Sequence, residues 1–505
     1  MIELNKYLTA KDFHTIVHNN EILAIHTDLK TKLNNSHNFF KNFSKNKVIY
    51  GVNTGFGPMA QYRVSEEDQK QLQYNLIRSH AAGSGKVMPV PFIRAAMVAR
   101  LNSICQAKSG VHASVIEVLT TLINKEVYPI IFEHGGVGAS GDLVQLAHLA
   151  LGLIGEGEVI YKGERRNTSE VFKELGIQPI EISVREGLSL INGTSAMTGI
   201  GLINFEKSNK LLHWSIAASA LINELVEAYD DHISVELNEV KLHEGQMHVA
   251  SLMRDQIKGT KLMKNRAEVL YSGENNEKIF KEKVQEYYSI RCIPQILGPV
   301  YDTIQNVGRV LENELNSAND NPIIDYEREM VFHGGNFHGD YVSLEMDKLK
   351  LVVTRISMLA ERQLNYLLNA KINEILPPFA NRGVLGLNYG VQGAQFTATS
   401  TTAENQMLSN SMYVHSISCN NDNQDIVSMG SNAAQITHKV IENAFEVMAI
   451  ELITIYQAIK FTNKIEKLSP KSQEIIATLG EVIPDIIEDN PVYPYIQRTK
   501  DFLMK

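Results

Sequence analysis

The segment ITHKVIENAFEVMAIELITIYQAIKF, residues 436–461, decides the fold class. It is apolar on nearly every side of a helix, which is typical of a helix at the centre of a bundle. It lies in one of two long windows without proline, 180–293 and 379–469. Because proline costs about 3 kcal/mol inside a helix, these windows favour long helices.

Two further segments support the same fold class. A helix is predicted over 202–229, and another over 341–370, where apolar side chains recur in steps of three and four. Short apolar runs at 158–161 (EVIY) and 330–332 predict only minor hairpins. We therefore predict a mainly α protein built on a bundle of long helices and not divided by a strong linker. The apolar positions of segment 341–370 are Val342, Met346, Leu349, Val353, Ile356, Ala360, Leu364 and Leu367.

Composition excludes several classes of protein. The 505 residues include 48 Lys and Arg against 57 Asp and Glu, a net charge of −9, which opposes nucleic-acid binding through bulk positive charge. The first residues, MIELNKYLTAKDFHTIV, lack the basic and apolar regions of a signal peptide, and no apolar run is long enough for a membrane span. Cys105, Cys292 and Cys419 form no C-x-x-C pair. We expect a soluble cytoplasmic protein with no metal and no membrane or nucleic-acid partner.

Several common catalytic motifs are incomplete or absent in the sequence. The stretch GASGD at 138–142 is no nucleophile elbow, because Asp142 stands where G-x-S-x-G requires glycine. The histidines of segment 243–248 are one residue too far apart for H-E-x-x-H. HGGN at 333–336 has no partner elbow, and neither a Walker A lysine motif nor a Rossmann fingerprint is present. These failures remove the usual grounds for a hydrolase, zinc protease, NTPase or dehydrogenase.

The densest glycine cluster, HGGVGASGD at 134–142, precedes an apolar helical run, with Asp142 as the predicted N-cap. Taken alone, it is typical of a flexible turn entering a helix. Its backbone offers a second interpretation: the amide nitrogen of Gly141 can attack the carbonyl carbon of Ala139, since glycine has no Cβ to block the approach. Loss of two waters, one from Ser140, gives 4-methylideneimidazol-5-one (MIO). This electrophile needs no external cofactor, and the following helix N-terminus favours negative charge on it.

The sequence G-A-S-G-D-L with the helix after it resembles the aromatic amino acid ammonia-lyases and aminomutases, which include histidine, phenylalanine and tyrosine ammonia-lyases. The resemblance extends from about Leu8 to the C-terminus and is nearest to the tyrosine ammonia-lyases of bacteria. Six further signatures occur in the order of the family: YGVNTGFG at 50–57, NLIRSH at 75–80, EGLSLINGT at 186–194, QEYYSIRC at 285–292, GGNFH at 334–338 and NQDIVSMG at 423–430.

This resemblance implies a fold and an assembly. The fold is the long helical bundle of the fumarase/aspartase-like ammonia-lyases, with a smaller N-terminal region that carries the MIO loop. Residues 1–200 are expected to hold the tyrosine and MIO loops, and residues 201–505 the long-helix bundle and the C-terminal helices. A homotetramer whose active sites are shared between subunits is expected, with an aromatic amino acid as the small-molecule partner.

The resemblance also implies catalytic roles. MIO formed from Ala139, Ser140 and Gly141 captures the substrate amine, which is otherwise a poor leaving group. Tyr50, on the glycine-rich loop, is the expected base for the β-hydrogen. Since a free phenol ionises only well above neutral pH, the site must favour its anion. In the absence of the family pattern, Tyr50 would be taken for a loop tyrosine that packs on a neighbour.

Further residues match the family's substrate pocket. Arg291 is expected to bind the substrate carboxylate through two hydrogen bonds; its alternative is a surface ion pair. Tyr288, counted with the catalytic residues, belongs with Asn192 and Gln285 to the set that holds the adduct and the MIO oxygen. Each of these would otherwise be an ordinary hydrogen-bonded polar group. The remaining matches are Asn336 and Phe337, which form a wall, and Glu404, a second acid/base group or a structural residue.

Substrate choice depends on two signatures. Ser79 and His80 resemble the selectivity pair of histidine- and tyrosine-specific enzymes, whereas the phenylalanine-type pair is apolar. The sequence NQDI at 423–426 resembles tyrosine and phenylalanine enzymes, where histidine enzymes usually read Q-E-D-H. By the same resemblance, Asn420 lies near His80 and Gln424 beside the carboxylate site. Together the two signatures indicate L-tyrosine.

The leading prediction is therefore the conversion of L-tyrosine to trans-p-coumarate and ammonia. Three alternatives stay open: histidine ammonia-lyase, which yields urocanate; tyrosine 2,3-aminomutase, which returns the amine to the β-carbon; and a catalytically silent helical assembly. The silent protein would keep an unmodified Ala139-Ser140-Gly141 tripeptide.

Overall fold

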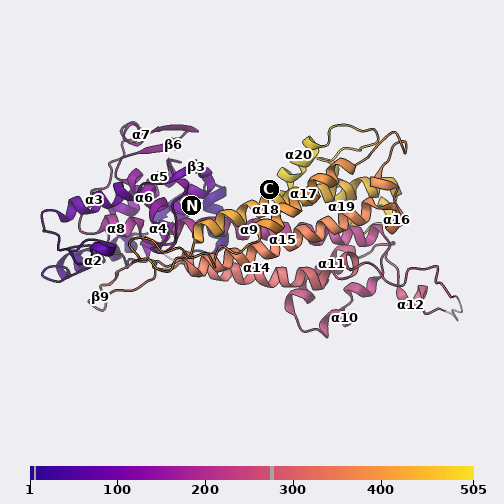
Figure 1. Ribbon diagram of the computed structural model, residues 1–505, viewed down its shortest axis with the longest axis horizontal. Helices are drawn as coiled ribbons and strands as arrows, with labels where there is room; N and C mark the ends of the chain where they lie inside the picture. The colour runs from indigo at the N-terminus through magenta and orange to yellow at the C-terminus, as the bar shows by residue number, and fades with distance from the viewer. Residues whose placement is uncertain (5–6, 273–277) are drawn as a thin grey trace. The chain divides into compact units, whose positions relative to one another are not determined.

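The computed structural model describes residues 1–4, 7–272 and 278–505, drawn as a ribbon in Figure 1. The chain forms two compact units, each assembled from three segments. The first unit comprises residues 1–206, 307–347 and 411–438, and the second unit comprises residues 207–306, 348–410 and 439–505. The predicted mainly α fold is confirmed. The predicted domain boundary at residue 200 stays a prediction.

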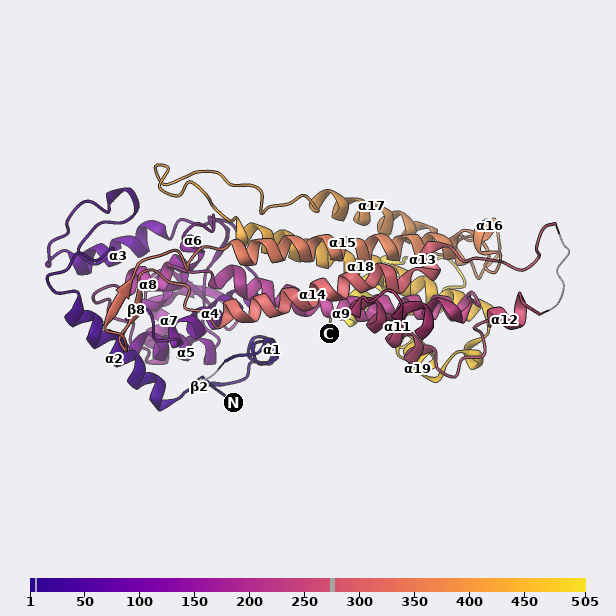
Figure 2. The same ribbon diagram turned by 90° about the horizontal axis from the view of Figure 1, so that it is seen from below.

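The three predicted long helices are present (Figures 1 and 2). Segment 436–461 lies within α18, Gly430–Thr462. Segment 341–370 corresponds to α15, Asp340–Leu368. The helix predicted over 202–229 is α9, which begins earlier and ends earlier. Its bounds are Ser195–Leu225.

A fourth long helix, α14 (Ile293–Leu315), was not predicted from the sequence. Its first turn contains Pro294 and its interior contains Pro299. Both prolines lie outside the proline-free windows on which the prediction relied. Because a proline within the first turn removes no intrahelical hydrogen bond, only Pro299 opposes this helix. The helix is amphipathic, and the burial of Ile304, Val307 and other apolar residues on one face compensates for the cost of this proline.

Each unit contains buried polar side chains on its long helices that are paired by hydrogen bonds. In the first unit, Asn204 on α9 donates to the carbonyl oxygen of Ala434 over 2.8 Å. In the second unit, Gln363 on α15 donates to Oγ of Ser219 over 3.0 Å. These bonds avoid the cost of an unpaired buried polar group, about 1–3 kcal/mol.

Shorter helices complete the first unit. Helix α4 is buried almost throughout, from Phe92 to Ile104, and its Arg94 donates to two main-chain carbonyls, those of Ile16 and Ile123, each over 2.9 Å. The shorter helical elements of this unit, α4 included, are α1 (Ala10–His18), α2 (Thr27–Phe43), η1 (Gly57–Met59), α3 (Gln69–His80), α4 (Val90–Cys105), α5 (Ser114–Asn124), α6 (Leu143–Leu153), α7 (Thr168–Leu175) and α8 (Glu186–Ile191).

Strands are short and lie in the first unit. Both predicted hairpins are confirmed: β6 pairs antiparallel with β7, and β9 with β8. β4 extends the β6–β7 sheet, β3 pairs antiparallel with β5, and β1 pairs in parallel with β2. The bounds are β1 (Ile2–Leu4), β2 (Leu23–Ile25), β3 (Ser84–Val87), β4 (Tyr128–Pro129), β5 (Phe132–His134), β6 (Glu158–Tyr161), β7 (Glu164–Asn167), β8 (Ile323–Asp325) and β9 (Met330–Phe332).

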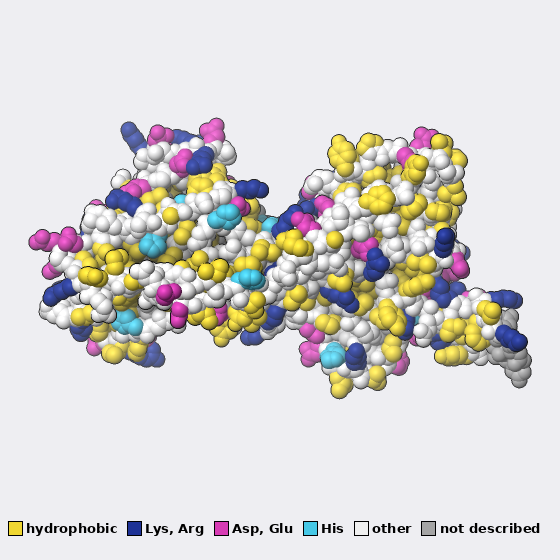
Figure 3. Space-filling model, viewed as in Figure 1, with side chains coloured by type: hydrophobic (Ala, Val, Ile, Leu, Met, Phe, Trp, Pro, Cys, Tyr) yellow, Lys and Arg dark blue, Asp and Glu magenta, His cyan; other side chains and the backbone are white. Residues whose placement is uncertain are grey.

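All the regular elements of the second unit are helices within its described residues, and the unit exposes many apolar side chains. In the space-filling view, hydrophobic side chains are spread over the face that α17 and α20 form in Figure 1 (Figure 3). None of the described helices combines the length and apolarity needed to cross a lipid bilayer. The helical elements wholly in this unit are η2 (Asp230–Ile233), α10 (Val235–Glu239), α11 (Glu244–Ile257), α12 (Arg266–Val269), α13 (Tyr288–Arg291), α16 (Ala370–Asn373), η3 (Pro378–Ala380), α17 (Gln392–Leu408), η4 (Ile465–Lys467), α19 (Pro470–Gly480) and α20 (Tyr493–Met504).

Candidate active site

The glycine-rich loop 134–142 is held in the first unit by close backbone contacts. The main-chain nitrogen of Asp142 donates to the carbonyl oxygen of Gly193 over 2.7 Å, and Gly193 donates back to Ser140 over 3.3 Å. Gly141 has φ +73°, and a Cβ at this position would overlap the Gly193 carbonyl. Both the backbone angle and the close approach therefore require glycine at 141.

The opposite side of the loop is fixed by residues from 339 and 428–430. Met429 donates from its main chain to the carbonyl of Val137 over 3.0 Å, and Gly339 donates to the carbonyl of Gly138 over 3.2 Å. The hydroxyl of Ser428 also donates to the Gly138 carbonyl, over 3.1 Å. Segments distant in the sequence thus hold both sides of the Ala-Ser-Gly tripeptide.

Four helices begin beside this loop. Helix α6 follows it directly, while α9, α15 and α18 begin within two residues of Gly193, Gly339 and Met429, the residues that contact it. The N-terminus of a helix carries partial positive charge from its unpaired N–H groups. The surroundings of the loop therefore favour negative charge that develops there.

Asp142 occupies the N-cap position of α6, as predicted, but its side chain makes no capping bond to that helix. Instead it accepts hydrogen bonds from the main-chain nitrogens of Ala196 and Met197, over 2.8 and 2.9 Å, and from the hydroxyl of Ser431. Complete burial raises the pKa of Asp142 to about 6, against the lowering effect of these three donors. The carboxylate thus caps α9 rather than α6.

A cavity of about 1210 Å³ adjoins the loop, and every residue that lines it belongs to the first unit. Most of the site residues predicted from the sequence meet there. Those that line the cavity are Tyr50, His80, Ala139, Ser140, Gly141, Asn192, Phe337, Asn420 and Gln424.

Tyr50 reaches the cavity from the loop 50–57. Its hydroxyl oxygen accepts a hydrogen bond of 3.0 Å from the main-chain nitrogen of Gly57, and its ring meets that of Phe56 edge-on at 6.0 Å. Gly57 has φ +52°, and a Cβ there would lie 2.7 Å from Nδ2 of Asn420. The tyrosine loop therefore packs directly against Asn420, and glycine permits this approach.

His80, the last residue of α3, is oriented by its own helix. Its Nδ1 lies 3.0 Å from the carbonyl oxygen of Leu76 and 3.1 Å from Oγ of Ser79. Because a carbonyl oxygen can only accept, the bond to Leu76 requires a proton on Nδ1. In the neutral imidazole, Nε2 is then a hydrogen-bond acceptor.

Gln424 connects the loop to a turn of unusual backbone. Its Nε2 donates to Oγ of Ser140 over 3.0 Å, and its Oε1 accepts from Sγ of Cys419 over 3.3 Å. The turn between them is sharp because Asn420, Asn421 and Asp422 all have positive φ, 50–57°. Cys419 was missed in the sequence analysis; its place beside Asn420 was the available signal.

Asn192 lines the cavity, but its amide nitrogen is engaged elsewhere. Nδ2 donates to Asp320 over 3.0 Å and to the carbonyl of Asn321 over 3.2 Å. Asp320 also forms a buried ion pair with Arg185, at 3.2 Å. The amide nitrogen of Asn192 could therefore donate to a substrate or a ring oxygen only in competition with these two hydrogen bonds.

Five predicted site residues do not line the cavity. Asn336 is exposed and donates to the carbonyl of Ala318 over 3.4 Å. The other four, Gln285, Tyr288, Arg291 and Glu404, belong to the second unit.

Three of these four have described partners within the second unit. Tyr288 is 70% exposed, and the Arg291 guanidinium lies 4.8 Å from the centre of its ring. Arg291 also donates from Nε to the carbonyl of Glu286 over 3.0 Å. Glu404 accepts from Nδ2 of Asn443 over 2.7 Å. Within the first unit, the glycine loop, Tyr50, His80 and Gln424 therefore meet around one cavity.

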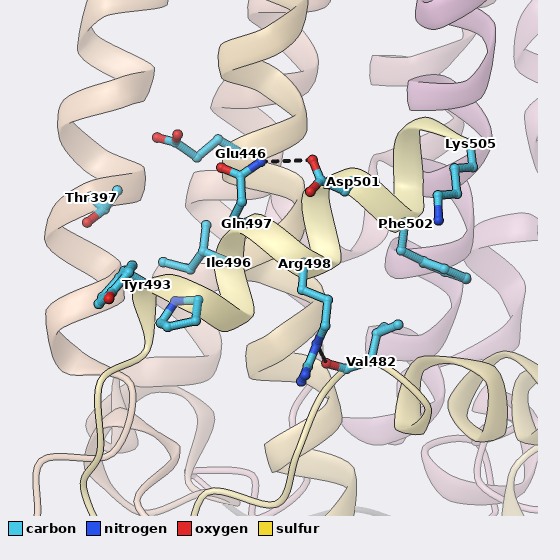
Figure 4. Close-up of a pocket in the computed structure, with 11 residues that line it drawn as sticks. Thr397, Glu446, Val482, Tyr493, Ile496, Gln497, Arg498, Asp501, Phe502 and Lys505 are labelled. Carbon is cyan, nitrogen blue, oxygen red and sulfur yellow. Dashed lines mark hydrogen bonds between the residues drawn. The ribbon is translucent and has the colours of Figure 1, made fainter.

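A second cavity, of about 830 Å³, lies in the second unit (Figure 4). Two of its polar side chains are engaged within the unit: Gln497 donates to Asp501 over 2.8 Å, and Arg498 donates to the carbonyl of Val482 over 2.6 Å. None of the predicted site residues lines it. The cavity at the glycine loop is therefore the candidate active site.

A mainly helical fold and an Ala-Ser-Gly loop beside four helix N-termini indicate the class of protein. The family model for aromatic amino acid lyases matches residues 8–481, and the chain belongs to this family. The predicted family, fold and carbon–nitrogen lyase class of enzyme are thereby confirmed.

Two relatives and one solved structure show the range of the similarity. The chain is 40% identical to a tyrosine 2,3-aminomutase of Myxococcus sp. (strain Mx-B0), over 90% of this chain and 88% of the relative. It is 34% identical to a histidine ammonia-lyase of Geobacillus sp. (strain WCH70), over 98% and 95%. The crystal structure of a tyrosine aminomutase from Streptomyces globisporus superposes with a TM-score of 0.95 and 33% identity, covering 100% of this chain and 96% of that one.

Proposed function

We propose that this chain is an MIO-dependent ammonia-lyase that converts L-tyrosine to trans-p-coumarate and ammonia. The observation that carries the proposal is the meeting of Tyr50, His80 and the Ala139-Ser140-Gly141 tripeptide around one cavity. A base, an acceptor for a phenol and the precursor of an electrophile are the three parts that such an elimination needs.

The loop fits the formation of MIO. Gly141 has positive φ and is pressed against Gly193, where no other residue fits, and a nitrogen without a neighbouring Cβ is the one suited to attack Ala139. When formed, MIO supplies an electrophile that binds the substrate amine and makes it a leaving group. The helix N-termini around the loop favour the negative charge that such an electrophile gains.

Two side chains, Tyr50 and His80, are assigned the remaining steps of the reaction. Tyr50 takes the β-hydrogen, with its oxygen positioned by the Gly57 main-chain nitrogen. His80 accepts the hydroxyl of the substrate at Nε2, because Leu76 holds its Nδ1 proton. A site that hydrogen-bonds this hydroxyl discriminates against phenylalanine, since the analogue leaves the imidazole unpaired.

We further propose a homotetramer in which other copies supply Gln285, Tyr288, Arg291 and Glu404 to each site. Two features support this. The family resemblance implies sites shared between subunits, and Gln285 and Tyr288 are exposed. The second unit also exposes large apolar side chains, among them Leu351 and Phe396, as expected of surfaces that are buried on assembly.

Tyrosine 2,3-aminomutase is the second candidate function. It is favoured by the 40% identity to the Myxococcus aminomutase. The two reactions share the ammonia elimination and differ in whether the amine returns to the β-carbon. Histidine ammonia-lyase is the third, favoured by the Geobacillus relative.

One experiment separates these functions. The purified chain is incubated with L-tyrosine, L-phenylalanine and L-histidine, and the products are identified by near-ultraviolet absorption and chromatography. Coumarate supports the proposal; β-tyrosine supports the aminomutase, and urocanate from histidine the histidine enzyme. Intact mass must also be two waters below that of the plain polypeptide.

The matched variants are Ser140→Ala and Ser169→Ala. Ser140→Ala removes the hydroxyl that leaves as the second water, so the ring cannot be completed and turnover is lost. Ser169 is exposed on α7, and its variant keeps the mass deficit and the activity. A wild-type chain of full polypeptide mass would support a catalytically silent protein instead.

A further inference from the structure

A cluster of two histidines and a glutamate lies in the first unit, apart from the cavity. His14 and His18 are four residues apart on α1 and thus share one face of the helix. Glu206 on α9 faces both: its Oε2 contacts Nδ1 of His14 and lies 3.5 Å from Nε2 of His18. One ligand atom from each side chain falls within 4.8 Å of the others. None of the three lines the cavity at the glycine loop.

We propose that His14, His18 and Glu206 bind one divalent zinc ion. Zinc takes histidine nitrogen and carboxylate oxygen at about 2.0–2.2 Å, which places neighbouring ligand atoms of a tetrahedral site about 3.4 Å apart. The 3.5 Å between His18 and Glu206 fits this spacing. Three protein ligands leave the fourth position to water.

The ligand set also selects the ion. Two imidazoles and one carboxylate suit zinc and its neighbours in the transition series, whereas magnesium and calcium prefer oxygen ligands throughout. Histidines at i and i+4 on a helix are a recurrent zinc-binding arrangement. The sequence analysis expected no metal because it searched for cysteine pairs and H-E-x-x-H, and Glu206 is far from the histidines in the chain.

Helix α1 holds its two histidines in place before any ion binds. Thr9 and Asp12 form a reciprocal capping box at its start. Its opposite face is buried through Phe13, Ile16 and Val17, and the carbonyl of Ile16 accepts from the buried Arg94. Because the helix is fixed, binding an ion costs little further ordering.

The cluster remains accessible to an ion. The side chains of His14, His18 and Glu206 are 33%, 30% and 22% exposed. An ion bound there would join α1 to α9 through three side chains. The site would therefore stabilise the N-terminal segment and take no part in the elimination, so it does not depend on the proposed function.

The test uses the full chain without a histidine tag, stripped with a chelator and then titrated with zinc chloride in a calorimeter. We expect one zinc per chain and a rise in the thermal midpoint with zinc concentration, since an ion that binds only the folded state stabilises it. Cobalt chloride provides a second readout, because four-coordinate cobalt has a visible absorption band.

The variants are His14→Gln, His18→Gln and Glu206→Gln, with His213→Gln as the control for an exposed histidine on the same helix α9. Each ligand variant is expected to weaken zinc binding by at least about tenfold and to lose the thermal shift, while the control keeps both. Thermal midpoints without zinc establish that the variants fold. Zinc binding that is absent from the wild type, or unchanged in the three ligand variants, overturns the proposal.

Discussion

The side-chain amide of Gln424 donates a hydrogen bond of 3.0 Å to the hydroxyl of Ser140. The two residues are 284 positions apart in the chain, and the bond joins the turn at 419–424 to the tripeptide from which MIO would form. The other end of the same amide is held by Cys419. Gln424 is therefore placed to orient the Ser140 hydroxyl before it is lost.

Replacing Gln424 with leucine is expected to lower turnover by about tenfold, the effect of one hydrogen bond worth about 1.4 kcal/mol. Intact mass distinguishes the cause: a reduced fraction of chains two waters lighter means that ring formation is slowed. The control is Gln473→Leu, which removes a bond to the Leu468 carbonyl in the second unit. Equal activity of the two variants would contradict the role of Gln424.

A side chain at Gly57 is expected to displace the Asn420 amide, since a Cβ would lie 2.7 Å from its Nδ2. Gly57→Ala should displace the Tyr50 loop and reduce kcat by at least tenfold while the chain stays folded. Gly176→Ala is the matched control, because Gly176 also has positive φ, +66°, but meets nothing within 4 Å. Both variants carry the backbone cost of about 1 kcal/mol; only Gly57→Ala should lose activity.

The fold was predictable where helices follow from local pattern. Segment 436–461 is apolar and free of proline, so its helix needs no information from elsewhere. The bounds of α9 were less predictable. It begins at Ser195 because Asp142, more than fifty residues upstream, accepts from the first main-chain nitrogens of the helix. It ends at Leu225 near Glu227, whose φ of +52° breaks the helical path.

The site was predictable only in part. Family signatures located the loop and Tyr50, and nine predicted residues line one cavity. The sequence shows His14 and His18 four residues apart, but it does not show that Glu206, far along the chain, lies beside them. The hydrogen bond from Asn192 to Asp320 was not predictable either. A bond between residues far apart in the chain produces no periodic pattern in the sequence.

Asp142 is expected to make stability depend on pH between about 4 and 6. Burial raises its pKa from 3.8 to about 6, so in this range the folded chain binds a proton that the unfolded chain has lost. The contribution of Asp142 to the free energy of unfolding is therefore complete below pH 3.8 and is lost as the pH rises through 6. Two pKa units correspond to about 3 kcal/mol.

Asp142→Asn removes this titration while keeping an acceptor for α9. The thermal midpoint of the wild type relative to the variant should therefore fall as the pH is raised from 4 to 7 and stay constant above. Asp255→Asn, which removes an exposed carboxylate, reports the effect of net charge alone. A difference between wild type and Asp142→Asn that is independent of pH would refute the raised pKa.

Tyr50→Phe is expected to lower kcat by at least about 10²-fold, since it removes the group assigned to proton transfer. Ring formation does not use the phenol, so the mass deficit of two waters should persist. Tyr62→Phe is the control: Tyr62 belongs to the segment after the same loop and is 71% exposed. Retained activity in Tyr50→Phe would show that another group removes the proton.

His80→Leu is expected to change substrate preference rather than abolish catalysis. The wild type holds an acceptor at Nε2, fixed by the Leu76 carbonyl, and leucine removes it while keeping similar bulk. The ratio of kcat/KM for L-tyrosine over L-phenylalanine should then fall by at least about 10²-fold, mainly through loss on tyrosine. The kcat/KM value for each substrate is measured from the appearance of its cinnamate product. Asn75→Leu, another substitution in the lining of the cavity, controls for a general change of polarity. If both variants shifted the ratio equally, the imidazole would not be the group that reads the hydroxyl.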